Sequence, residues 1–199
     1  SLGGQCSGKV VHMGAVMNQQ LEYALKYFSH RARTGGSTSL NIYLVVPKVL
    51  EEVGSIAVLT SYIAALGDVV VGSSVVEVET DATAAADDML ATMGEGGTVV
   101  NMLSNSSLTH ALLTAMKAQS LAGAFPVVST GVTEDDIDSL GSLLRNQYLA
   151  MPYFQAMDST QNTILLGAME GFYGSDYQVT ANMEAAYSAV DYWAEAAEA

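Results

Sequence analysis

Residues that could do chemistry are few and scattered along this chain. The three histidines, His12, His30 and His110, lie in separate segments and lack the paired spacing of metal ligands. No segment matches the nucleophile motif GxSxG, the phosphate-binding motif GxxxxGK or the zinc motif HExxH. The lone Cys6 excludes an internal disulfide and a cysteine metal cage. We therefore predict a protein that is not an enzyme, with no catalytic residue, metal or cofactor, and a hydrolase is a remote alternative.

The acidic run Glu134-Asp135-Asp136 is the densest group of ionisable side chains. It follows Thr133, a residue type that caps helix N-termini, and carboxylates in a first helical turn are stabilised by the positive end of the helix. Consecutive helical positions also point apart, whereas metal ligands must converge. The pattern predicts a helix start and not a metal site.

Composition and charge restrict the class of protein and of partner. The chain has 199 residues, half of them hydrophobic, which is enough for a sizeable core. No apolar run reaches the roughly 18 residues that a membrane-spanning helix needs, which predicts a soluble fold without membrane insertion. The net charge of −14 repels phosphate backbones, so nucleic acid is not expected as a partner.

Apolar runs alternate with helical periodicity, a pattern typical of a parallel sheet covered by helices. Five segments are predicted as strands: Lys9–Met13, Leu40–Val46, Val69–Val78, Thr98–Leu103 and Phe125–Ser129. Helices are predicted after a cap at Asn18, over Glu51–Leu66, Thr83–Met93, Ser107–Ser120 and Asn162–Tyr173, and after a cap at Asn182. The fold class is therefore α/β, a three-layer, doubly wound, mainly parallel sheet with a C-terminal helical appendage.

Ligands of open parallel sheets bind beyond the carboxyl ends of the strands, where loops carry free backbone donors. Three loops occupy such positions: Val46–Lys48, Ser104–Ser107, and Ser129–Gly131 leading to Glu134. The candidate ligand-binding residues are Pro47, Ser104, Asn105, Ser106, Ser129, Thr130 and Glu134.

Several segments together resemble one family. They are GQCSGKVVHMGAVMNQQ (4–20), IYLVV (42–46), GGTVVNMLSNSS (96–107), PVVSTGVTEDDIDSLG (126–141), MPYFQAMD (151–158) and MEAAYSAVDYW (183–193). In order and spacing they resemble the substrate-binding proteins of ABC transporters, of the urea and short-chain amide type, with the type I periplasmic-binding-protein fold. The resemblance implies that residues 1–148 form a Rossmann-like second lobe and that 149–199 supply a hinge strand and two helices of a first lobe. A periplasmic or organelle-lumen origin is implied too, although the chain starts at Ser1 without a targeting segment, so the compartment is left open.

The chain departs from this family where the ligand should bind. The family's Tyr-x-Tyr-Pro motif, which clamps a small amide, is replaced by VVPKVLEEVG, and its Gly-Asp-Ser by Asn105-Ser106-Ser107. Each missing hydrogen-bond partner lowers discrimination for an amide. Because most of a first lobe is also absent from this sequence, we expect no appreciable binding of urea, acetamide or branched-chain amino acids.

Two functions remain. The first is a degenerate, non-enzymatic accessory subunit of a larger assembly, with other protein subunits as partners. Its predicted interface includes the last helix and the chain near it: Tyr153, Tyr187, Val190 and Trp193. The alternative is a substrate-binding component of an ABC transporter or sensor, with a small polar ligand such as urea, an amide or an amino acid.

Overall fold

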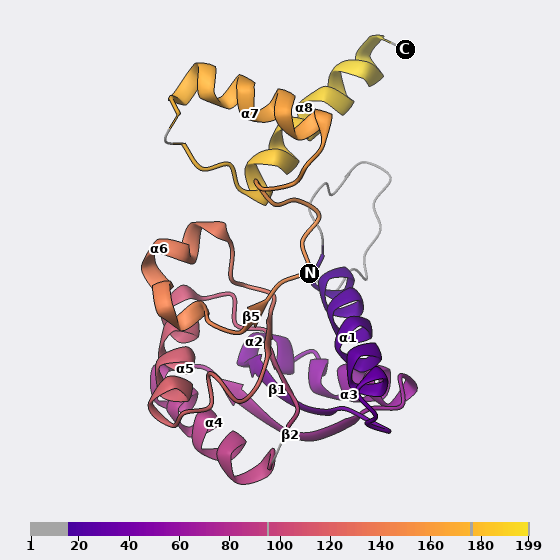
Figure 1. The fold of residues 1–199 in the computed structure, drawn as a ribbon, viewed down its shortest axis with the longest axis vertical. Helices are drawn as coiled ribbons and strands as arrows, with labels where there is room; N and C mark the ends of the chain where they lie inside the picture. The colour runs from indigo at the N-terminus through magenta and orange to yellow at the C-terminus, as the bar shows by residue number, and fades with distance from the viewer. Residues whose placement is uncertain (1–15, 95, 176, 199) are drawn as a thin grey trace. The chain divides into compact units, whose positions relative to one another are not determined.

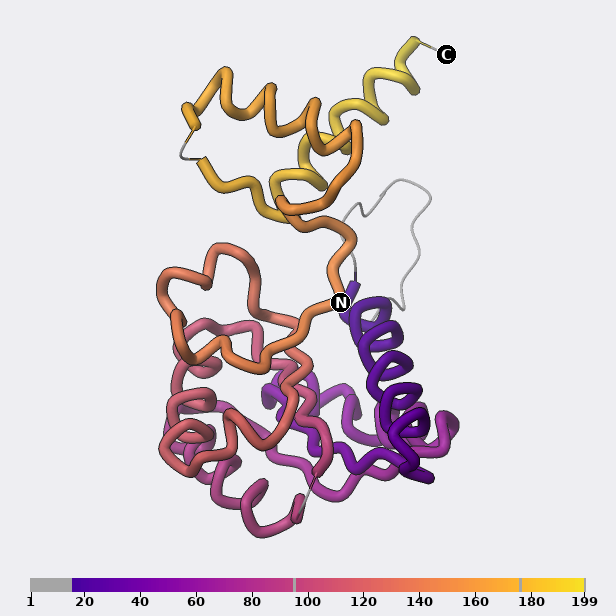
Figure 2. Tube along the Cα trace, viewed as in Figure 1, coloured from indigo at the N-terminus to yellow at the C-terminus, as the bar shows by residue number. Residues whose placement is uncertain are grey.

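The computed structural model describes residues 16–94, 96–175 and 177–198 of the chain (Figures 1 and 2). These residues form two compact units. The sheet unit comprises Gln20–Val132 and Asp136–Ala150. The helical unit comprises the described residues of 16–19, 133–135 and 151–198. Each unit has its own buried core and is described separately.

A five-stranded parallel sheet is the centre of the sheet unit. Its strands are β1 (Asn41–Pro47), β2 (Val69–Val76), β3 (Thr98–Asn101), β4 (Val127–Ser129) and β5 (Gln147–Tyr148), in the order β2-β1-β3-β4-β5. Leu44 pairs with Ser73 on one side and with Val100 on the other, and Val100 pairs with Val128. Burial on both faces explains why β1 is apolar almost throughout. The α/β class with a parallel sheet is thus confirmed.

Four of the predicted strands coincide with β1 to β4, with small differences at their ends. The fifth, Lys9–Met13, lies outside the described residues. The place of a fifth strand is taken by β5, in a segment for which no strand was predicted. Two half-buried residues, one of them polar Gln147, produce no apolar run, so the sequence pattern did not reveal this strand.

Helices cover both faces of this sheet (Figure 1). Helices α4 (Glu79–Thr92) and α5 (Ser106–Ala118) bury Met89 and Leu112 in one core with Tyr43 and Val99 of the strands. On the other side lie α1 (Met17–Thr34) and α3 (Ser55–Ala65). The predicted apolar stripe of α1 is buried. Its Phe28 ring packs edge-on against the Tyr148 ring of β5, with 4.9 Å between the ring centroids.

The predicted helix over Glu51–Leu66 is wrong in its continuity. It is divided into α2 (Lys48–Glu51) and α3 by Gly54, whose φ of 76° lies in the left-handed region that breaks a helix. The predicted start of α4 at Thr83 is also wrong, because the helix begins at Glu79. The Asp81 carboxylate accepts hydrogen bonds from the backbone N–H of Glu77 and Val78, at 2.9 and 3.0 Å, and so satisfies donors ahead of the helix.

Two predicted caps lie inside helices instead. Asn18 follows the first residue of α1, and Asn182 follows the first residue of α8 (Ala181–Glu198). Helix α7 (Thr160–Tyr173) is capped by Ser159, whose hydroxyl accepts from the Asn162 N–H at 3.1 Å. The helix predicted after Thr133 is a series of short turns: η1 (Glu134–Asp136), α6 (Ile137–Leu140) and η2 (Gly141–Leu144).

The helical unit has a small core of Tyr153, Leu165, Val179 and Ala181, against which Tyr187 and several methionines pack. Residues 151–155, expected as a hinge strand, are irregular here. Side-chain hydrogen bonds replace a strand ladder: the Val179 N–H donates to the Gln155 side chain at 2.9 Å. Among the described residues, no helix is long and apolar enough to cross a membrane.

Candidate functional site

The order β2-β1-β3 places a topological switch point between the carboxyl ends of β1 and β3, where the chain leaves toward opposite sides of the sheet. A hollow of about 320 Å³ opens there. Loops after β1, β2 and β3 all contribute to its lining, which includes Pro47, Lys48, Glu52, Glu77, Ser104 and Asn105. We call it the switch-point hollow.

An ion pair crosses this hollow from one loop to the next. The Lys48 ammonium lies 2.6 Å from a carboxylate oxygen of Glu77, and this contact raises the pKa of Lys48. Both side chains are about half exposed, and exposed ion pairs contribute little to stability. Lys48 can therefore exchange Glu77 for the anionic group of a ligand at small cost.

Asn105 fixes the position of α5 at the edge of the hollow. Its side-chain oxygen accepts hydrogen bonds from the backbone N–H of Ser107 at 2.9 Å and of Leu108 at 3.4 Å. Ser104 and Ser106, on either side, are exposed. The cap leaves the positive N-terminal end of a 13-residue helix beside the hollow.

The loop after β4 lies against the loop after β3. A Cβ atom at Gly131 would fall 2.2 Å from the Leu103 carbonyl oxygen, so only glycine permits this approach. Ser129 is buried and donates to the Gln147 side chain at 2.8 Å, and the Thr130 hydroxyl is buried with no hydrogen-bond partner among the described residues. These two residues support the carboxyl edge and do not line the hollow.

The structure brings together three of the candidate residues, Pro47, Ser104 and Asn105, and places Ser106 in the adjoining turn. Sequence reasoning missed Glu52 and Glu77. Glu77 directly follows β2, and nothing in the sequence shows that β2 is the neighbour of β1. The predicted strand Val69–Val78 included Glu77, so its loop position gave no signal in the sequence.

Glu134 belongs to the helical unit. One carboxylate oxygen accepts from the Gln155 N–H at 3.1 Å, and the other is buried with no hydrogen-bond partner among the described residues. Nearby, the Tyr153 hydroxyl donates to Asn162 at 2.9 Å. Burial, and then the Glu134 and Glu184 carboxylates, raise the pKa of Tyr153, so its phenol is neutral at physiological pH.

The predicted interface residues differ in accessibility. Val190 and Trp193 on α8 are 64% and 73% exposed, so the face that carries them is open within the described part of the chain. Tyr187 is half-buried, and Tyr153 is only 5% exposed. Tyr153 therefore supports the core of the helical unit rather than its surface.

Comparison with known proteins agrees with the fold. Residues 2–199 match the family described as periplasmic binding protein domain. The chain belongs to this family. No curated protein matches the sequence. Membership of this family supports a binding-protein-like role, and proteins of such a family are generally not enzymes. It extends to the superfamily and not to the urea and amide branch.

The candidate catalytic groups are dispersed in this periplasmic binding protein domain. His30 lies near the end of α1 and His110 in α5, both exposed, while His12 and Cys6 lie outside the described residues. In the part of the chain that the structure describes, no three His, Cys, Asp or Glu side chains converge on a point suited to a metal ion.

Proposed function

We propose that this domain binds a small zwitterionic solute, such as a small amino acid, in the switch-point hollow. The observation that carries the proposal is the convergence of three loops on one hollow beyond the carboxyl ends of β1, β2 and β3. A binding-protein family and a hollow at the switch point of its sheet favour the same class of function.

The charges of the hollow favour a zwitterion. Lys48 and the N-terminal end of α5 suit a carboxylate, while Glu52 and Glu77 suit an ammonium group. A ligand without net charge also avoids repulsion by a protein of net charge −14. Because Val49 stands in the hollow without a hydroxyl, neutral amides find fewer partners there.

The test is a titration of isotope-labelled protein by NMR with glycine, acetate, methylammonium and acetamide. We expect saturable shifts at Lys48 and Ser104 with glycine, and weaker effects with the other three, which lack one or both charges. Lys48→Met should weaken glycine binding several-fold. Lys26→Met is the matched control, because Lys26 makes a comparable exposed ion pair with Glu22 on α1, outside the hollow.

Two results would contradict the proposal. One is the absence of shifts around the hollow with glycine. The other is equal binding by the Lys48 and Lys26 variants, which would mean that the hollow does not contact the ligand.

An accessory subunit is the second candidate function. It is favoured by the exposure of Val190 and Trp193 on one helix, because exposed apolar side chains grouped together mark protein contacts. The acidic residues around them, Asp191 and Glu195, suit a basic or polar partner surface. Co-migration of the purified native protein with other subunits tests this function.

A further inference from the structure

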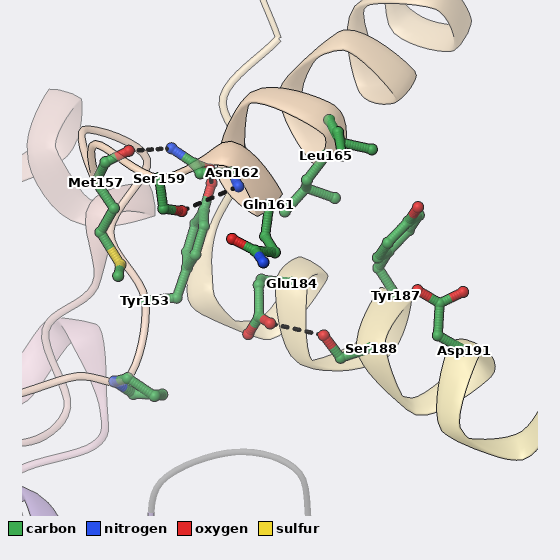
Figure 3. Close-up of a pocket in the computed structure, with 12 residues that line it drawn as sticks. Tyr153, Met157, Ser159, Gln161, Asn162, Leu165, Glu184, Tyr187, Ser188 and Asp191 are labelled. Atoms are coloured by element: carbon green, nitrogen blue, oxygen red, sulfur yellow. Dashed lines mark hydrogen bonds between the residues drawn. The ribbon is translucent and has the colours of Figure 1, made fainter. Parts of the chain in front are cut away.

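A second hollow, which the proposed solute site does not use, lies in the helical unit. It has a volume of about 350 Å³, within the range of small-molecule sites. Helices α7 and α8 and the irregular segment before α7 surround it (Figure 3). We call it the helical hollow.

Two carboxylates from one helix line the helical hollow. Glu184 and Asp191 are seven residues apart on α8, two turns of helix, so they lie on the same side with a rise of about 10 Å between them. Glu184 accepts a hydrogen bond from the Ser188 hydroxyl at 2.7 Å. Asp191 has no hydrogen bond or ion pair to any described residue.

Among the described residues from 146 to 198, no cation compensates these carboxylates. Every charged residue after Arg145 is acidic, so α7, α8 and the segments joining them carry no lysine, arginine or histidine. Coulomb attraction from this region, and from a chain of net charge −14, favours a positively charged ligand.

Apolar and aromatic side chains complete the lining. Ile164 and Leu165 of α7 offer aliphatic surface, and Tyr187 lies between the two carboxylates in sequence and beside Asp191 in space (Figure 3). Neutral tyrosine rings attract ammonium groups through their faces. Tyr153, buried at the base of the unit, is held neutral by its surroundings.

We propose that the helical hollow binds a short aliphatic diamine. One ammonium group pairs with Glu184 and the other with Asp191, while the methylene chain lies against Tyr187 and the aliphatic side chains of α7. This site is independent of the switch-point hollow, because all of its residues belong to the helical unit.

The experiment is calorimetric titration of the full chain with 1,5-diaminopentane, pentylamine and 1-pentanol at low salt. We expect the diamine to bind more tightly than the monoamine, and the alcohol not to bind. The variant Glu184→Gln/Asp191→Asn should weaken diamine binding at least tenfold. Its matched control is Glu195→Gln/Glu198→Gln, which removes the same charge from exposed positions of the same helix.

Three outcomes would overturn the proposal. Equal weakening in both double variants would mean diffuse attraction to an acidic helix. Equal affinity for diamine and monoamine would mean that the two carboxylates do not act together, and no saturable binding would mean no site. Asp191→Lys is a second variant that should fold, since Asp191 is exposed, and its own ammonium group should abolish diamine binding. Retained binding by this variant would also overturn the proposal.

Discussion

Asn162 joins separate segments of the helical unit through its side-chain amide. The amide nitrogen donates to the carbonyl oxygens of Gln155 at 2.9 Å and Met157 at 2.7 Å, and the amide oxygen accepts from the Tyr153 hydroxyl. Asn162 is 6% exposed, so its amide group is largely shielded from water. The irregular segment before α7 therefore depends on one side chain for much of its conformation.

Asn162→Ala should destabilise the helical unit by about 3 kcal/mol, because it removes three hydrogen bonds, one of which satisfies the buried Tyr153 hydroxyl. Chemical denaturation followed by NMR signals of this unit measures the effect. Gln161→Ala, at the exposed neighbouring position, is the control and should change the free energy of unfolding little. A loss below about 1 kcal/mol for Asn162→Ala would show that the segment is held by other contacts.

Because of Asp81, we expect the stability of the sheet unit to fall at acidic pH. Hydrogen bonds from the backbone N–H of Glu77 and then of Val78 lower the pKa of its carboxyl group. A group whose pKa is lower in the folded state stabilises the fold above its unfolded pKa of about 4, and this contribution is lost as the pH falls through the folded pKa.

Asp81→Ala should therefore be less stable than the parent protein at pH 7, and the difference should shrink as the pH is lowered below 4. Unfolding curves at several pH values measure it. Glu79→Ala, in the same helical turn, is the control. A difference that does not change with pH would mean that Asp81 acts through packing and not through its charge.

At the scale of residues, the sequence predicts which residues lie at the ends of the strands better than it predicts what each of them contacts. Pro47, Ser104 and Asn105 were expected at the site because each follows or ends a predicted strand, and they line the hollow. Ser129 follows the same rule but is buried against Gln147, and that contact depends on a strand the sequence pattern did not reveal.

At the scale of elements, apolar runs and their order predict the strands, because strands buried on both faces need such runs. Ends and breaks are less predictable. The interruption at Gly54 and the early start of α4 depend on single backbone conformations and side-chain bonds, which compete with helical periodicity. The sequence offers several glycines and polar residues that could break or start a helix, and only the structure shows which of them does so.

The contact between the loops after β3 and β4 gives a prediction for an element. In Gly131→Ala, the new methyl group would meet the backbone of Leu103 and Ser104, which cannot move aside as a side chain can. We expect a loss of about 2 kcal/mol or more in the free energy of unfolding. Gly123→Ala, where a Cβ meets nothing within 4 Å, is the control for thermal unfolding. If both variants unfold alike, the two loops are not in close contact.

At the scale of the whole molecule, the family assignment and the parallel sheet were predictable, since both rest on segments in a fixed order along the chain. The helical hollow was not predictable. It depends on how α7 and α8 pack around Tyr153 and Leu165, and helical periodicity gives the apolar face of each helix but not its partner.

Trp193 is the only tryptophan and is 73% exposed. If α8 contacts another subunit, Trp193→Asp should release the protein from its complex and leave the sheet unit folded, because the charge cannot be buried without a partner. Size-exclusion chromatography and circular dichroism measure the two effects. Trp193→Phe is the conservative control and should still assemble. Normal assembly of the aspartate variant would exclude this helix face as the interface.

The absence of lysine and arginine after Arg145 also determines how the helical unit responds to common reagents. Trypsin has no cleavage site between residues 146 and 199, so both α7 and α8 leave a digest on one long peptide. Amine-directed cross-linkers find no side chain to modify on these helices. Direct cross-links between α7 or α8 and a partner would therefore need carboxylate-directed reagents.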